Sequence, residues 1–295
     1  MPKDTVWMQE MSSADIADYL RRDEAVIVPI GSCETHGPHL PTGTDTYEAI
    51  SYSEGIARKA GVLCTAPIWF GDSPHHLHKP GTVSLQPETV IAVLKDVYRS
   101  LIHHGFRQII TFNGHRWANL HVINIASRAI KAEHPGVLFA CMDPVALAAE
   151  RTQEVREEPG AGSHGDELET SAMLYAYPDL VHADRYVFSH GMLIESRFVP
   201  TDPFASGDKV MYIGGVEDQA RLAPVGHVGD PRKASAAKGQ ALFEAIVANG
   251  AEFIADLRRH ARNGARAQGG TGSQAEELFE KENQVRRRRR DQQWQ

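Results

Sequence analysis

Short apolar runs separated by longer amphipathic segments dominate the pattern along the first half of the chain. The apolar runs predict strands at residues 25–30, 62–70, 108–112 and 137–142. Because these runs are almost continuously apolar, both faces of the predicted sheet are expected to be covered by other elements.

The segments between the runs predict helices. Residues 86–105 are the clearest case, because apolar side chains recur there at helical spacing between Pro87 and Gly105. Further helices are predicted at residues 14–23, 45–59, 117–133 and 234–262, and another from about Glu167. This alternation predicts an α/β fold with helices on both faces of a mainly parallel sheet.

The C-terminal part is less regular. Residues 185–232 are rich in Gly and Pro, residues 263–274 have the composition of a linker, and residues 275–295 are highly charged. We therefore expect one domain over residues 1–262, followed by a linker and a charged tail or helix over residues 263–295.

Composition narrows the class of protein. The 295 residues carry a net charge of −7, which argues against general binding of nucleic acid. Residues 1–25 lack the apolar stretch of a signal peptide, and no apolar run approaches the length of a membrane span. The three distant cysteines are typical of reduced thiols. Together these features predict a cytoplasmic protein without a membrane partner.

Side chains that commonly bind metals follow the predicted strands. Glu34, His36 and Asp45 come after the strand at 25–30, and His115 comes after the strand at 108–112. In open α/β sheets the carboxyl ends of the strands form the ligand-binding edge, so these side chains are expected to lie together. A third polar cluster contains His164 and Glu167, which share a face if their segment is helical.

Each residue has a simpler explanation when it is taken alone. Asp45 suits a helix N-cap, the sequence 113–115 (Asn-Gly-His) suits a surface turn, and Glu34 suits one half of a surface ion pair. The combination is harder to explain in this way. Three carboxylates and two imidazoles at strand ends are what two zinc- or manganese-like ions require, with one Asp shared between them.

Other motifs are absent or lack their structural context. Residues 160–165 fit the dinucleotide pattern G-x-G-x-x-G, but a polar segment and not a strand precedes them. There is no nucleophile elbow, Walker A sequence or H-E-x-x-H motif. The histidine-rich loop at 73–82 suits the mouth of an active site. The arginines at 286–290 suit a solvated tail better than an RNA-binding segment.

Three motifs resemble those of the creatininase (creatinine amidohydrolase) family. They are G-S-x-E-x-H-G-x-H-L-P-x-x-T-D at 31–45, N-G-H at 113–115 and H-x-x-E-x-E-T-S at 164–171. The similarity extends in order over about residues 20–260. It implies a three-layer α/β/α sandwich with a mainly parallel sheet, and a homo-oligomer that is commonly a hexamer.

The resemblance also implies a site with two divalent ions, zinc, manganese or both. The implied metal ligands are Glu34, Asp45 and His115 for one ion, and His36, Asp45 and Glu167 for the other. His164 would be the catalytic acid/base, because the ordinary pKa of histidine lies near working pH. Water between two cations loses a proton near neutral pH, and the hydroxide can attack a polarised carbonyl.

The chain departs from creatinine-hydrolysing members of that family at two positions. It has Trp117 where they carry a further Glu ligand, and Gly160 where they carry a Trp that stacks on the ring. Creatinine is therefore not the expected substrate. The candidate substrate-binding residues are Arg116, Trp117, His76 and His78, which suit a small polar molecule.

The resemblance leaves three functions open. The first is a ring-opening amidohydrolase that acts on a small polar cyclic or amide substrate. The second is a carbon–carbon-bond hydrolase that opens a cyclic polyol ketone such as a dehydro-inosose. The third, from another class, is an inactive metal-binding structural or RNA-associated protein. Family membership favours the two hydrolases, with amide hydrolysis slightly ahead.

Overall fold

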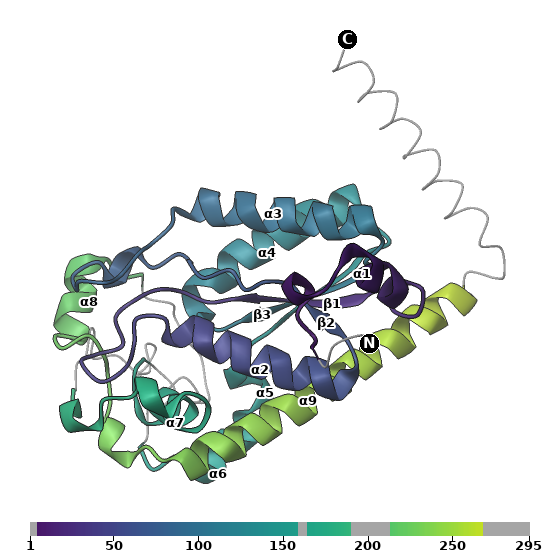
Figure 1. Cartoon of the computed structure of the whole chain (residues 1–295). Helices are drawn as coiled ribbons and strands as arrows, with labels where there is room; N and C mark the ends of the chain where they lie inside the picture. The colour runs from purple at the N-terminus through teal and green to yellow at the C-terminus, as the bar shows by residue number, and fades with distance from the viewer. Residues whose placement is uncertain (1–4, 159–163, 190–212, 268–295) are drawn as a thin grey trace. The chain divides into compact units, whose positions relative to one another are not determined.

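A parallel four-stranded sheet forms the centre of the computed structural model, which describes residues 5–158, 164–189 and 213–267 (Figure 1). The strand order is β2-β1-β3-β4. The strands are β1 (Ala25–Ile30), β2 (Leu63–Cys64), β3 (Gln108–Asn113) and β4 (Leu138–Met142). The α/β fold class expected from the sequence is confirmed.

The predicted helices are found with small shifts at their ends. Over the described residues the helices are α1 (Ser13–Leu20), α2 (Thr44–Ala60), α3 (Pro87–His104), α4 (Arg116–Glu133), α5 (Pro144–Leu147), α6 (Ala149–Val155), α7 (Glu167–Ala176), α8 (Val216–Leu222) and α9 (Ala236–Ala267). Short 3₁₀ turns are η1 (Met8–Glu10), η2 (Pro74–His76), η3 (Pro178–Leu180), η4 (Ala183–Arg185) and η5 (Pro231–Lys233). Gly61 and Gly105 end α2 and α3 with φ of 69° and 119°, which glycine adopts without strain.

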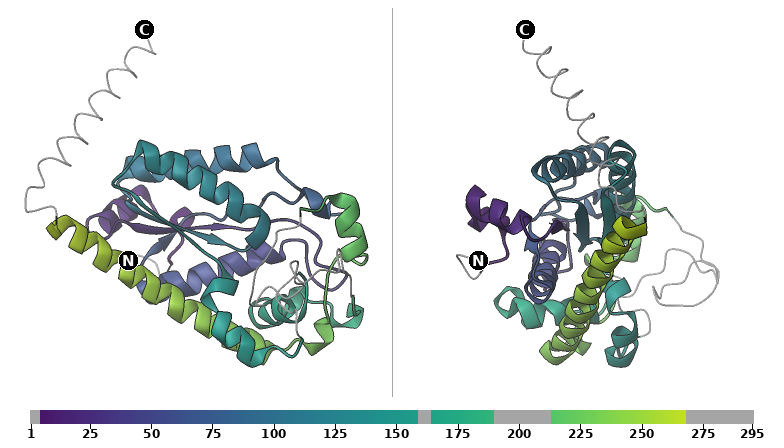
Figure 2. Two further views of the ribbon diagram at one scale, coloured as in Figure 1. Left: turned by 180° about the vertical axis from the view of Figure 1, so that it is seen from behind. Right: turned by 90° about the vertical axis from the view of Figure 1, so that its right-hand side faces the viewer.

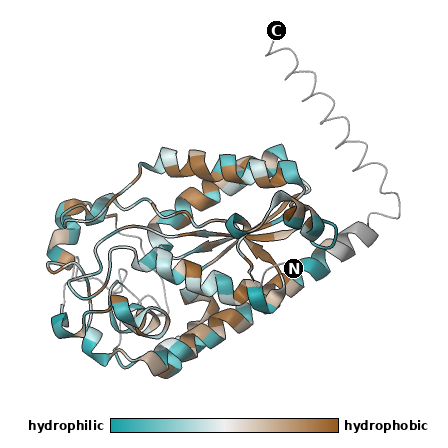
Figure 3. Cartoon of the chain, viewed as in Figure 1, coloured by the Kyte–Doolittle hydropathy of each residue, from teal (hydrophilic) through white to brown (hydrophobic). Residues whose placement is uncertain are grey.

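Helices cover both faces of the sheet. In two views α3 and α4 lie side by side on one face, and α2 lies on the other (Figures 1 and 2). Hydrophobic residues concentrate on the strands (Figure 3), where Val26, Val28 and Ile30 of β1 are fully buried against Leu94 and Tyr98 of α3. This is the sandwich that continuous apolar strands require, because neither face of the sheet meets water.

The second strand is shorter than its apolar run. Only Leu63–Cys64 forms strand, although residues 62–70 were predicted, and an isolated bridge between Ile30 and Ile68 follows. Pro67 lies inside the run and has no N–H to donate, so a continuous ladder cannot form there. The run then leaves the edge of the sheet and leads into the loop that contains η2.

The C-terminal expectations are only partly covered by the described residues. Helix α9 continues to Ala267, so residues 263–267 are helical where linker composition was predicted. The chain forms two compact units, Met1–Ala251 and Glu252–Gln295. The domain boundary at 262 stays a prediction, and the charged tail at 275–295 lies outside the described residues. Among those residues no helix is long and apolar enough to span a bilayer.

Two glycines allow the start of α2 to approach the ends of the strands. A Cβ atom on Gly114, just after β3, would lie 2.0 Å from the Asp45 carbonyl oxygen. A Cβ atom on Gly31, just after β1, would lie 2.3 Å from Thr46 Oγ1. Since real Cβ atoms do not come so close, only glycine at both positions permits this packing. It holds Asp45 against the carboxyl edge of the sheet.

Candidate metal centre

Five of the predicted site residues lie together at the carboxyl ends of β1 and β3. They are Glu34 and His36 after β1, Asp45 in the first turn of α2, His115 at the N-cap of α4, and His164 shortly before α7. Their exposed fractions range from 0% to 9%, so all are buried. The motifs therefore predicted correctly which distant segments meet.

Asp45 lies between two imidazoles. Its Oδ1 is 3.0 Å from His36 Nε2, and its Oδ2 is 3.2 Å from His115 Nδ1. The N-cap of α2 is Gly43, so the Asp45 carboxylate does not cap the helix, and that simpler explanation is wrong. A carboxylate that reaches one histidine with each oxygen is the geometry expected of a ligand shared by two ions.

Glu34 contacts imidazoles with both oxygens. Its Oε2 lies 3.4 Å from His115 Nε2, and its Oε1 lies 3.4 Å from His76 Nε2 and 3.6 Å from His164 Nδ1. Ser32 Oγ donates a hydrogen bond to Oε2 at 3.2 Å. Glu34 is 1% exposed, so it is not half of a surface ion pair.

The third carboxylate of the centre is Glu169 and not Glu167. Glu169 Oε2 lies 3.5 Å from His36 Nε2 and accepts a hydrogen bond from the Gly165 N–H. Glu167 is buried elsewhere, where it accepts hydrogen bonds from the backbone N–H groups of Glu157 and Glu158 and pairs with Lys238.

The placement of Glu169 beside His36, where Glu167 was expected, has a physical cause. His164 and Glu167 share a face only if both are helical, but α7 begins at Glu167, after the N-cap Asp166, so His164 is not part of the helix. Glu169 is the third residue of α7, the position from which an acidic side chain reaches back toward the residues before the N-cap. That position was visible in the sequence once the helix start was recognised.

The charges in the centre depend on one another. Burial lowers the pKa of His36, but the Asp45 and Glu169 carboxylates outweigh it and hold the pKa well above its ordinary value. Burial likewise opposes protonation of His115, yet Glu34 and Asp45 raise its pKa to about 9. Burial raises the pKa of Glu169 to about 7. The centre therefore retains protons that a cation could replace.

The donor set fits a divalent metal. His36 Nδ1 lies 3.1 Å from the Glu34 carbonyl, and His115 Nε2 lies 3.1 Å from the Asp72 carbonyl. Carbonyl oxygens can only accept, so these nitrogens donate, and the other ring nitrogens face carboxylates across a position that a proton or a cation can fill. Carbonyl-anchored imidazoles facing carboxylates are typical of metal ligands.

Three sets of potential ligand atoms lie close enough to share an ion. Within each set the atoms are all within 4.8 Å of one another: Glu34, His36 and His164; His36, Asp45 and Glu169; and Glu34, His75 and His115. The last set contains His75, which sequence reasoning assigned only to an active-site loop.

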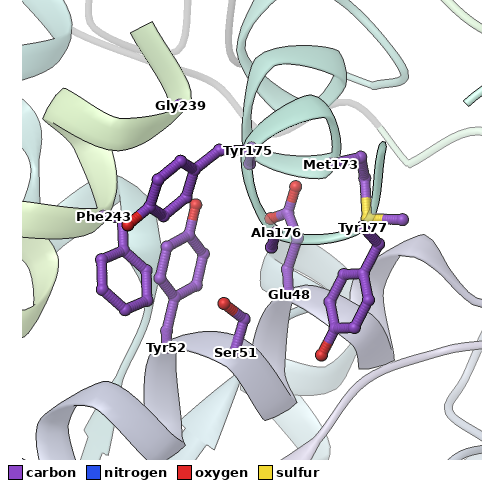
Figure 4. A pocket seen from close by; sticks show the side chains of 10 residues that line it. Glu48, Ser51, Tyr52, Met173, Tyr175, Ala176, Tyr177, Gly239 and Phe243 are labelled. Carbon is purple, nitrogen blue, oxygen red and sulfur yellow. The ribbon is translucent and has the colours of Figure 1, made fainter. Parts of the chain in front are cut away.

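A further buried acid, Glu48, lies close to the centre. Glu48 is one helical turn beyond Asp45 and lines a pocket with Tyr52, Met173 and Phe243, between α2, α7 and the N-terminal part of α9 (Figure 4). Burial, with the charge of Glu169 added, raises the pKa of Glu48 well above its ordinary value. This shift favours the neutral form of Glu48, which adds less negative charge near the candidate ligands than a carboxylate would.

Of the predicted substrate-binding residues, His76 lies at the centre, whereas His78, Arg116 and Trp117 contact residues around it. His76 is buried, and its ring stacks on His164 with centroids 4.2 Å apart. His78 instead donates a hydrogen bond to the Ala223 carbonyl. Arg116 lies over the ring of Trp117, which is 52% exposed. Their roles stay predictions, and Gly160 lies outside the described residues.

Known proteins with similar sequences and folds match most of the chain. The family model described as creatinine amidohydrolase matches residues 9–254. A 3-dehydro-scyllo-inosose hydrolase from Thermotoga maritima is 30% identical over 261 residues, which are 85% of this chain and 83% of that protein. A creatinine amidohydrolase from Pseudomonas putida is 28% identical over 247 residues, 79% of this chain and 89% of that protein. A solved structure described as "Creatininase Mn" has the same fold, with a TM-score of 0.71 at 24% identity over 86% of this chain and 99% of that one.

Two neighbouring glutamates provide a matched test of the ligand set. We expect Glu169→Gln to weaken binding of one divalent ion at least tenfold, because it removes a charged oxygen beside His36. We expect Glu167→Gln to leave metal affinity unchanged but to lower the free energy of unfolding by about 1–3 kcal/mol, because Lys238 and two N–H groups lose a charged partner. Zinc titration measures the first effect, and urea unfolding in the presence of a chelator measures the second. Metal loss in Glu167→Gln alone would restore the original assignment.

Proposed function

Because this chain is a hydrolase that belongs to the creatininase family, we propose that it binds two divalent ions and hydrolyses a carbonyl-activated bond in a small, oxygen-rich ring. The observation that supports this most directly is the position of Asp45. Its two oxygens face two histidines that come from different strand ends, at 3.0 Å and 3.2 Å.

The proposed ligands are grouped around that shared carboxylate: Glu34, Asp45 and His115 for one ion, and His36, Asp45 and Glu169 for the other. A mixture of carboxylate and imidazole donors suits zinc and manganese. When bound, such ions polarise a carbonyl oxygen and lower the pKa of water. The protein orients the imidazoles through the backbone carbonyls of Glu34 and Asp72.

His164 is proposed to move the proton. Its Nε2 donates to the Thr35 carbonyl at 2.6 Å, so the lone pair of Nδ1 is directed toward Glu34, 3.6 Å away. Burial and the neighbouring His36 lower the pKa of His164 well below its ordinary value. The imidazole therefore starts neutral, accepts a proton from the attacking water, and then delivers it to the leaving group.

Two side chains next to the centre, Arg116 and Trp117, favour a polar substrate. Arg116 directly follows His115, and its Nε and Nη1 atoms are buried without a hydrogen bond among the described residues. Its Nε lies 3.5 Å from Asp143 Oδ1. Guanidinium donors that form no hydrogen bond within the described residues suit hydroxyl, carboxylate or enolate oxygens of a substrate. The exposed ring of Trp117 offers an apolar wall beside them.

A cyclic polyol ketone is the first candidate substrate. The similarity to the inosose hydrolase at 30% identity favours it over the amides that the sequence alone placed slightly ahead. In a cyclic 1,3-diketone, water adds to one carbonyl carbon and the bond to the carbon between the two carbonyls breaks. The electron pair stays on that carbon as an enolate, and the proton held by His164 completes the product.

A small cyclic amide is the second candidate, favoured by the similarity to the creatinine amidohydrolase. There the C–N bond breaks, and the leaving nitrogen takes the proton from His164. The same protein groups serve both reactions, so the walls of the pocket decide between them. The arginine-rich tail, on which an RNA-associated function would depend, lies outside the described residues.

His164→Ala should separate catalysis from metal binding. We expect metal content to be unchanged and kcat to fall at least ~10²-fold, the usual contribution of a general acid–base group. His103→Ala is a suitable control, because this exposed histidine lies in the last turn of α3, away from the centre. If His164→Ala loses an ion as well as activity, His164 is a ligand and the proposed division of roles fails.

A substrate panel tests the proposed reaction. With zinc- or manganese-loaded protein, we expect kcat/KM to be highest for inosose-type diketones, lower for lactams, and negligible for creatinine. Creatinine turnover at or above ~10⁴ M⁻¹s⁻¹, the low end for native enzymes, would contradict the proposal. Turnover of lactams but not of diketones would make the second candidate the function.

Assembly into a homo-oligomer, with a hexamer as the expected size, is part of the proposal. The partly exposed side chains of Trp69 and Phe70, at 38% and 42%, support it, because large apolar groups at a surface favour association. Light scattering should give a mass several times 32.5 kDa for the full chain. A monomeric mass would contradict it.

A further inference from the structure

The loop between β2 and α3 brings one more imidazole to the metal centre. His75 lies in η2, and its ring is parallel to that of His115, with centroids 6.0 Å apart and an interplanar angle of 11°. One ligand atom each from Glu34, His75 and His115 lie within 4.8 Å of one another. A single cation between them could contact all three.

Neighbouring side chains fix this loop in place. The Ser73 N–H donates to Ser84 Oγ at 2.8 Å, and Thr82 Oγ1 donates to the His76 carbonyl at 3.0 Å. The adjacent His76 is buried, and its Nε2 lies 3.4 Å from Glu34 Oε1. Hydrogen bonds within the loop therefore hold the backbone that carries His75, and His76 connects it to the metal centre.

The ring of His75 is available to a metal. Its contacts with other described residues are ring contacts to His76 and His115, and no hydrogen bond to either of its nitrogens is formed among those residues. The ring is partly buried.

We propose that His75 is a fourth protein ligand of the ion held by Glu34, Asp45 and His115. This inference rests on the proposed function, since it assumes that an ion binds there. Catalytic zinc with three protein ligands keeps a position for water and can expand to five ligands, so His75 adds a fourth protein ligand while the position for water remains. Two imidazoles and two carboxylates would then hold this ion.

The two ion positions would consequently differ in their preference for zinc or manganese. The ion at His75 would have two nitrogen donors, whereas the ion at His36, Asp45 and Glu169 would have one. Nitrogen donors favour zinc, and oxygen donors suit manganese. We therefore expect zinc to fill the His75 position first when both metals compete, with manganese retained more readily at the other.

Metal titrations of the full-length protein test the inference. Zinc chloride is titrated into wild type, His75→Ala, His75→Glu and the control His103→Ala, with a competing chelator to report each dissociation constant. We expect His75→Ala to weaken one ion by at least ~100-fold, the upper end of the loss seen when a ligand's outer partner is removed. The second ion should stay bound, and His103→Ala should match wild type.

The His75→Glu variant distinguishes the loss of a ligand from misfolding of the loop. His75→Glu supplies an oxygen ligand, so we expect two ions to bind, with the competition between zinc and manganese chloride shifted toward manganese at the weakened position. Unchanged dissociation constants in both His75 variants would overturn the inference while leaving the proposed function intact. Wild-type protein that binds no ion would instead overturn the proposed function, and this inference with it.

Discussion

Three buried imidazoles in this protein are oriented by backbone carbonyls so that their second nitrogen faces a carboxylate. His36 is held by the Glu34 carbonyl, His115 by the Asp72 carbonyl and His164 by the Thr35 carbonyl. A lone pair directed at a carboxylate is unfavourable unless a proton or a cation lies between them. Since burial makes each unpaired charge costly, this single constraint explains why the site suits divalent metal.

The fold supplies the positions that this constraint requires. Parallel strands β1 and β3 end side by side, and Gly31 and Gly114 let the start of α2 approach both ends. The buried Asn119 adds a brace, because it donates to the Gly31 carbonyl and accepts from the Asp72 N–H. Asn119, which lies in α4 directly after His115, thus fixes Asp72, whose carbonyl orients His115. Ligand geometry is built into the core and not left to mobile side chains.

Specificity has a different structural origin. Ligands come from strand ends and helix starts, whereas the candidate substrate contacts come from the loop at 73–82 and the first residues of α4. Relatives with 30% and 28% identity carry names for unlike substrates, an inosose and creatinine. In the proposed function the buried centre supplies the carbonyl chemistry, and side chains at the start of α4 such as Arg116 and Trp117 select the molecule that presents the carbonyl.

The sequence by itself determined the elements and most of the site. Continuous apolar runs identify strands, and the terminal glycines of α2 and α3 mark helix ends, because both effects act between near neighbours in the chain. The motifs at 31–45 and 113–115 identified four candidate ligands whose side chains lie together in the structure: Glu34, His36, Asp45 and His115. Only the tertiary structure decided that Glu169 and not Glu167 faces His36, since that depends on the residue at which α7 begins and on Lys238, far along the chain. It also placed His75 beside His115, because contact between a loop and a strand end is set by packing and not by local spacing.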